Sequence, residues 1–236
     1  MEIGEIFSDA FMYPLKNIKA LVIYAILGII VGIASAGSIA GMNAGMSANN
    51  LLAVIGSGII GIIISLLIGF VIEGYLLDVI KFGITRDDAA PEIDLIRQSI
   101  NGVKLFIITL VYYLIPIIIS ALLAIFLANW LSSLIAAILF IIFAFAAFMG
   151  QCRLAKTEDL MYSLNIAGAL ADITKIGIVK IIIFTIVVFI AALVLSLIGT
   201  AISQLNAVVG GIIMGIIGIY LTFAIARASG LLYSSV

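Results

Sequence analysis

The stretch "GSGIIGIIISLLIGFVIEGYLLDVIK", residues 56–81, decides the fold. It is apolar, with interspersed glycine and serine, until Glu73 introduces a carboxylate. A helix that crosses the hydrocarbon core of a bilayer needs about 20 predominantly apolar residues. The stretch therefore predicts a transmembrane helix whose end lies close to Glu73.

The composition of the whole chain agrees with this prediction. Hydrophobic residues make up 65% of the 236 residues and charged residues only 10%, whereas a soluble domain has about 25% charged residues. The net charge of -1 provides no basic surface for nucleic acid. We expect a membrane protein without a nucleic-acid partner.

Three stretches contain no Asp, Glu, Lys or Arg: residues 20–72, 105–152 and 181–226. Each is long enough for two spans. Each also has a polar or small-residue break near its middle, namely "SAGSIAGMNAGMSANN", "ANWLSS" and "GTAISQLN". The sequence predicts an all-α polytopic membrane protein with six transmembrane helices that form three hairpins.

The positive charges predict the orientation of these hairpins. All eleven Lys and Arg residues fall on one side of the predicted membrane, and Lys and Arg favour the cytoplasmic side. We expect a multi-pass protein of the cell membrane with both termini in the cytoplasm. As an alternative, Lys16 and Lys19 before an apolar run and "ASA" at residues 34–36 are similar to a cleavable signal peptide, but the leading segment is long and acidic.

Short amphipathic segments, here called leaders, precede the first, third and fifth spans. Their apolar residues recur at helical spacing. They are Ile3, Ile6, Phe7, Ala10 and Phe11 in the first leader, Ile93, Ile96, Ile100 and Val103 in the second, and Ile166, Leu170, Ile173 and Ile176 in the third. The pattern predicts three interfacial helices.

The leaders and spans indicate an internal repeat. Superimposing Lys19, Lys104 and Lys180 aligns the leader ends and the first helix of each hairpin. The second helices align through Phe70, Phe148 and Phe223. We interpret residues 1–236 as a single membrane domain of three repeats, approximately 1–81, 82–156 and 157–236, each a leader plus a helical hairpin. Chance alignment of apolar sequences is the alternative.

The second span carries a stripe of small residues at every fourth position. The stripe consists of Ser57, Gly61, Ser65 and Gly69. Small residues at this spacing allow helix backbones to approach closely. Close helix packing is the interpretation we favour over a glycine-lined pore.

Polar residues lie near the predicted cytoplasmic ends of the second helices. Glu73 follows the stripe, Gln151 aligns with it in the second repeat, and Arg153 and Arg227 lie close to the same level. They predict a polar girdle of Glu73, Gln151, Arg153 and Arg227, in which Glu73 pairs with Arg227 or Arg153. The alternative is that each side chain reaches water independently.

The segments "DAFMYPLKNIKALVIY", "GYLLDVIKFG" and "RLAKTEDLMYSLNIAGALADITKIG" carry a resemblance to a known family. The chain resembles the uncharacterised archaeal membrane proteins of the DUF4013 family over nearly its whole length. More distantly, it is similar to the membrane domains attached to glycerophosphodiester phosphodiesterases. The resemblance implies a helical membrane domain and assigns no functional residue.

The residue types present argue against several chemistries. The chain has no histidine and one cysteine, Cys152, which removes imidazole catalysis, most zinc sites and any internal disulfide. The acidic residues Asp87, Asp88, Glu158, Asp159 and Asp172 fall in short connections, where we expect solvated charges. We therefore expect no catalytic, cofactor-binding or metal-binding residue.

These exclusions favour a non-enzymatic integral membrane module that acts through lipid contact, self-association or a cytoplasmic partner. The partners expected are membrane lipids, a second copy of the chain or a cytoplasmic protein. The alternative is a permease or channel for a small neutral or apolar solute, which needs no intramembrane charge. Enzymatic modification of lipid is a third hypothesis.

Overall fold

The computed structural model describes residues 1–236, apart from the side chain of Ala207. Nearly all of the described backbone is helical, and it contains no strand. The helices are α1 (Ile3–Lys16), α2 (Ile18–Ser47), α3 (Leu51–Thr85), α4 (Leu95–Phe126), α5 (Asn129–Thr157), α6 (Leu160–Ser163), α7 (Ile166–Ile176), α8 (Ile178–Leu205) and α9 (Ala207–Tyr233). The all-α prediction is confirmed.

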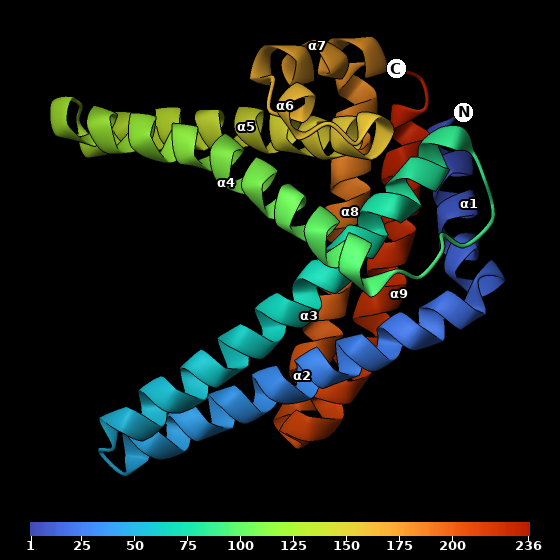
Figure 1. Ribbon diagram of the computed structural model, residues 1–236. Helices are drawn as coiled ribbons and strands as arrows, with labels where there is room; N and C mark the ends of the chain where they lie inside the picture. The colour runs from blue at the N-terminus through green and yellow to red at the C-terminus, as the bar shows by residue number, and fades with distance from the viewer.

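Six of the helices are long and apolar enough to cross a membrane: α2, α3, α4, α5, α8 and α9. They form three consecutive antiparallel hairpins, as Figure 1 shows. The breaks between partners fall within the polar segments expected from the sequence. Asn50 and Asn206 are the N-caps of α3 and α9: the Asn50 side chain accepts a hydrogen bond from the backbone amide of Ala53, and that of Asn206 accepts from the amides of Val208 and Val209.

The three hairpins converge at one end of the molecule and diverge at the other (Figure 1). We call the end where they converge the charged end, because it carries the Lys and Arg residues. The buried core lies there, and it includes Tyr24, Tyr75, Tyr112 and Phe223. The hairpin tips have mostly exposed apolar side chains, as expected for helices that face lipid.

The first and third leaders form separate helices. In α1, Ile6 and Ala10 are buried, and the helix packs against α9. In α7, Ala169 and Ile173 are buried, and the helix packs against α5. Their apolar faces therefore contact the protein's own bundle.

The second leader has no helix of its own. It forms the first turns of α4, which begins after the capping residue Asp94 and continues without a break to Phe126. The third leader is separated from α8 by Gly177, whose φ of 96° lies in the left-handed region that favours glycine. In the second leader the helix continues through Gly102, whose φ is not positive, and Ile96 is 77% exposed.

Close helix crossings join the hairpins. Glycines at these crossings lie against the backbone of the neighbouring helix. They are Gly28, Gly32, Gly211 and Gly215 between α2 and α9, Gly74 and Gly102 between α3 and α4, and Gly83 and Gly230 between α3 and α9. The first and third hairpins, and the first and second, are therefore held by backbone contact that a larger residue would prevent.

The small-residue stripe of α3 contacts another helix only in part. Gly61 lies beside Ser38 of α2, and the hydroxyl of Ser38 donates a hydrogen bond of 2.7 Å to the carbonyl oxygen of Ser57. Ser65 borders an open groove between α2 and α3. A Cβ atom added at Gly69 would have no neighbour within 4 Å, so this end of the stripe faces open space.

The glycine crossing between α3 and α4 leads to a test within one helix. We expect Gly74→Ala to destabilise the protein, because the new methyl group would overlap the backbone of Gln98. Overpacking of this kind costs about 1–3 kcal/mol. Gly69→Ala is the matched control and should not lower stability, since its methyl group would meet open space. Melting temperatures in a nonionic detergent measure both, and equal values for the two variants would contradict the described crossing.

Candidate functional site

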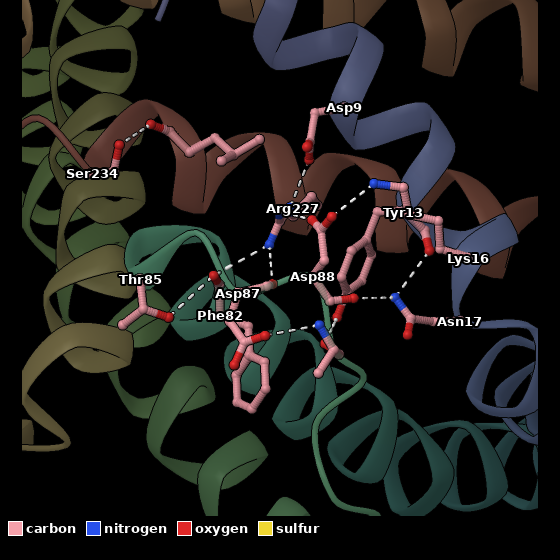
Figure 2. A network of polar contacts seen from close by, with 12 residues as sticks. Asp9, Tyr13, Lys16, Asn17, Phe82, Thr85, Asp87, Asp88, Arg227 and Ser234 are labelled. Atoms are coloured by element: carbon pink, nitrogen blue, oxygen red, sulfur yellow. Dashed lines mark hydrogen bonds and ion pairs between the residues drawn. The ribbon is translucent and has the colours of Figure 1, made fainter.

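Arg227 lies at the centre of a polar network that joins α1, the α3–α4 connection and α9 (Figure 2). Its side chain is only 1% exposed. The guanidinium group donates to Oδ1 of Asp9 at 2.8 Å, to Oδ1 of Asp88 at 2.7 Å, and to the carbonyl oxygens of Phe82 and Asp87. Buried arginine is thus paired and hydrogen-bonded, as such a charge requires.

The surroundings of Asp88 and Tyr13 extend this network (Figure 2). Lys16 forms an ion pair of 2.8 Å with Asp88, and this hydrogen bond is the main cause that lowers the pKa of Asp88 below its ordinary value. The ring of Tyr13 lies 4.8 Å from the guanidinium carbon of Arg227, and its hydroxyl donates to the carbonyl oxygen of Ala89. Burial raises the pKa of Tyr13, which keeps that hydroxyl protonated.

Arg153 forms a second buried ion pair, with Asp172 of α7. The two side chains lie 2.8 Å apart and are 5% and 2% exposed. Asp172 also accepts hydrogen bonds from Lys175 at 2.7 Å and from the hydroxyl of Tyr233 at 2.6 Å. Burial alone would raise the pKa of Asp172, but these hydrogen bonds and the charge of Arg153 outweigh it and hold the pKa below its ordinary value.

The expectation that the acidic residues of the connections are solvated is therefore wrong for Asp172. The carboxylate is buried because α7 folds back onto α5 and places Asp172 beside Arg153. Asp88 remains half exposed, yet it bridges Lys16 and Arg227.

A third ion pair joins the start of α4 to α3, with the charges reversed. Here Arg97 lies on the second leader and Asp78 on the span, 2.8 Å apart. Beside them, Gln98 accepts a hydrogen bond from the hydroxyl of Tyr24 and donates to the carbonyl oxygen of Glu92. Each leader thus pairs with the second helix of a different hairpin: α1 with α9, α4 with α3, and α7 with α5.

The sequence analysis missed these partners, although a signal was present. Asp9, Arg97 and Asp172 each lie seven to ten residues before the lysines used to align the repeats. The apolar faces of the leaders predict interfacial helices but do not indicate that the ionisable residue shared by all three pairs with a charge on a second helix. The internal repeat itself stays a prediction.

A cavity lies between α3, α5, α8 and α9, which we call the central cavity. Its volume is about 370 Å³, and most of its wall is apolar, including Phe145, Phe148 and Phe184. The cavity forms where α5 and α8 diverge, since these helices meet at the stacked rings of Phe148 and Phe184 but do not pack along each other as α2 and α9 do.

The polar residues of the central cavity include two members of the predicted girdle, Glu73 and Gln151. The others are the hydroxyl residues Thr185, Thr222 and Ser229. The Glu73 side chain is exposed to the cavity. Among the described residues, it has neither an ion-pair nor a hydrogen-bond partner.

The structure therefore corrects the expected pairing of the girdle. Glu73 and Gln151 share the central cavity, whereas Arg153 and Arg227 form no part of its wall. Arg227 pairs with Asp9 and Asp88, and Arg153 with Asp172. The pairing was wrong because depth along the spans places these residues at a similar level but does not specify which face of each helix they occupy.

A second hollow of about 710 Å³ runs along α8 and α9, which we call the α8–α9 groove. It shares Thr222 and Ile225 with the central cavity, so the two hollows are adjacent. At its other end it reaches Ser203 and Gln204, close to the tip of the hairpin.

Within the described part of the chain, no cluster of three His, Cys, Asp or Glu side chains is arranged to hold a metal ion.

The Arg227 network leads to a test by double-mutant cycles. We expect Asp9→Asn and Arg227→Gln to be coupled by more than about 0.5 kcal/mol in the free energy of unfolding, because the two side chains are in direct contact. Glu73→Gln and Arg227→Gln should be additive within about 0.5 kcal/mol. Unfolding by SDS in mixed micelles measures both cycles. Coupling in the second cycle but not in the first would contradict the described network.

The lowered pKa of Asp172 predicts sensitivity to acid. Because the folded value is below the ordinary value of about 3.9, the ionised carboxylate stabilises the fold above that ordinary value. This contribution is lost as the pH falls through the lowered pKa. We expect the melting temperature to fall between about pH 5 and pH 2, and less steeply in Asp172→Asn. Asp159→Asn is the control and should retain the wild-type dependence, since asparagine can also cap α6. The same acid dependence in Asp172→Asn and in the wild type would contradict the assignment.

Comparison with known proteins identifies the family of the chain. A family model described as "Protein of unknown function (DUF4013)" matches residues 58–204, from within α3 to the last turn of α8. No curated protein and no solved structure matches the chain. Because the family model covers more than half of the sequence and includes Glu73, Gln151 and Arg153, the chain belongs to the DUF4013 family of proteins of unknown function.

Proposed function

We propose that this protein is a non-enzymatic membrane module that acts through lipid contact, by holding a lipid chain between its hairpins. The observation that carries the proposal is that the central cavity and the α8–α9 groove lie side by side and share Thr222 and Ile225 in their walls. The cavity volume of about 370 Å³ lies in the range of about 300–1,000 Å³ typical of sites for small ligands.

The lining of the two hollows suits an apolar occupant. Aromatic and aliphatic side chains form most of the cavity wall, and the groove is bounded by Leu195, Met214, Leu221 and Ile225. A void without an occupant leaves its lining atoms without dispersion partners. Lipid chains surround the hairpins of a membrane protein, so they are the nearest source of matching apolar groups.

The leaders leave apolar surface that suits lipid contact. Ile6 and Ala10 of α1 and Ala169 and Ile173 of α7 are buried against the bundle, whereas Met12 and Leu15 of α1 and Ile96 of α4 are exposed, as an interfacial helix in contact with lipid requires. The residue types support a non-enzymatic role, because the chain has no histidine and the thiol of Cys152 is buried.

A second candidate function is a permease for a small neutral or apolar solute. It is favoured by the extent of the α8–α9 groove, which runs from Thr222 and Ile225 beside the central cavity to Ser203 and Gln204 near the hairpin tip. The two functions differ in whether the occupant remains bound or passes through.

The cavity proposal leads to a test with two variants of α8. We expect the wild-type protein, purified in a nonionic detergent, to retain lipid in native mass spectrometry. Val188→Trp should reduce the lipid-bound fraction severalfold, because the indole would fill part of the cavity that Val188 lines. Val194→Trp is the matched control and should retain lipid, since Val194 is 50% exposed and lines neither hollow.

Transport assays with the same variants separate the two candidate functions. Retention of lipid that is lost in Val188→Trp, without solute flux through the protein in liposomes, supports the lipid-holding module. Reproducible flux of a neutral solute that is lost in Val188→Trp would instead identify a permease. Unchanged lipid retention in Val188→Trp would contradict the proposal.

A further inference from the structure

We propose that the central cavity binds the head group of an amphiphile with a primary amine, and that Glu73 is its counter-ion. This inference rests on the proposed function, because it names the head group of the lipid that the hollows hold. Glu73 is the only ionisable side chain in the described cavity wall. A carboxylate in a mostly apolar cavity is stabilised by a cation that enters with its own hydrogen-bond donors.

The hydroxyl groups of the cavity wall also favour a ligand that donates hydrogen bonds. Thr185 donates to the carbonyl oxygen of Ile181 at 2.8 Å, Thr222 to that of Ile219 at 3.0 Å, and Ser229 to that of Ile225 at 2.7 Å. Each hydroxyl has thus committed its proton to its own helix, and only its lone pairs remain for a ligand.

The cavity therefore presents mainly hydrogen-bond acceptors. Only the side-chain amide of Gln151 adds donors. A protonated primary amine carries three donors and no acceptor, which complements this wall. A head group with a phosphate or a carboxylate would bring further acceptors and a negative charge toward Glu73.

The buried arginines do not provide the cavity with a positive charge that would attract such an acidic head group. The guanidinium group of Arg227 is bonded to Asp9 and Asp88, and that of Arg153 to Asp172. Neither arginine lines the central cavity, and no lysine does. The site therefore favours an amine without an adjacent phosphate.

The α8–α9 groove favours an amphiphile over a small water-soluble amine. The groove borders the cavity at Thr222 and Ile225, about two turns and one turn before Ser229 on α9. An apolar chain attached to an amine at Glu73 can continue into the groove and bury surface there, at a gain of roughly 25 cal/mol for each Å². A short amine makes no such contact.

Ligands that share one chain but differ in head group test the inference. Dodecylamine, 1-dodecanol and dodecanoate would be titrated against the delipidated protein in nonionic detergent at neutral pH, with native mass spectrometry as the readout. We expect dodecylamine to bind about tenfold more tightly than 1-dodecanol, as a charge-assisted hydrogen bond provides, and dodecanoate to bind most weakly. Ethylamine should show no saturable binding at concentrations where dodecylamine saturates, and equal binding of ethylamine would indicate a site for soluble amines.

Variants of Glu73 test whether this residue causes the preference for the amine over the alcohol. Glu73→Gln should lose the preference for the amine yet bind 1-dodecanol as the wild type does, which also shows that the cavity is still formed. Glu73→Asp should retain part of the preference. Glu92→Gln removes an exposed carboxylate outside the cavity and should behave as the wild type.

The outcomes separate this inference from the proposed function. Retention of native lipid that is sensitive to Val188→Trp, together with equal binding of the amine and the alcohol, would overturn the head-group assignment and leave the lipid-holding module standing. An amine preference that survives in Glu73→Gln would also overturn the assignment. If native lipid is not retained and none of the probes binds, the proposed function fails together with the inference.

Discussion

An arginine that is buried at the edge of a membrane must have an anionic partner, and this requirement determines how the leaders and the hairpins fit together. Breaking a buried ion pair by removing one partner costs about 3–5 kcal/mol, because the remaining charge is left without compensation. Arg227 and Arg153 are both buried in the described structure. Their acids lie on α1 and α7, so both leaders are held against the bundle by this constraint.

The close crossings and the ion pair of Arg153 with Asp172 join different pairs of hairpins. Glycine contacts bring α2 against α9 and α3 against α4, which joins the first hairpin to each of the other two. The second and third hairpins lack a comparable crossing and are connected through α7, whose Asp172 bonds to Arg153 of α5 and to Tyr233 of α9. The central cavity forms on this less closely packed side.

The sequence was sufficient for the membrane class, the six long helices and the positions of the breaks between them, because charge-free length and turn residues are local signals. It was insufficient for the continuity of the second leader with α4, since amphipathic spacing does not specify where a helix is interrupted. The pairing of the girdle also failed. Glu73 and Arg227 lie near one depth, but the partner of a charge depends on the rotation of each helix about its axis, and apolar spans carry little information on that rotation.

The reversed charges of the pair between Asp78 and Arg97 have a consequence for how the chain assembles. If all three leaders carried an acid and all three second helices an arginine, any leader would attract any helix. With one pair reversed, Arg97 in the place of Asp9 or Asp172 would meet Arg227 or Arg153, and either aspartate in the place of Arg97 would meet Asp78. The sign of the charges thus distinguishes the pair between α3 and α4 from the other two, and it selects against bundles in which the start of α4 exchanges places with α1 or α7.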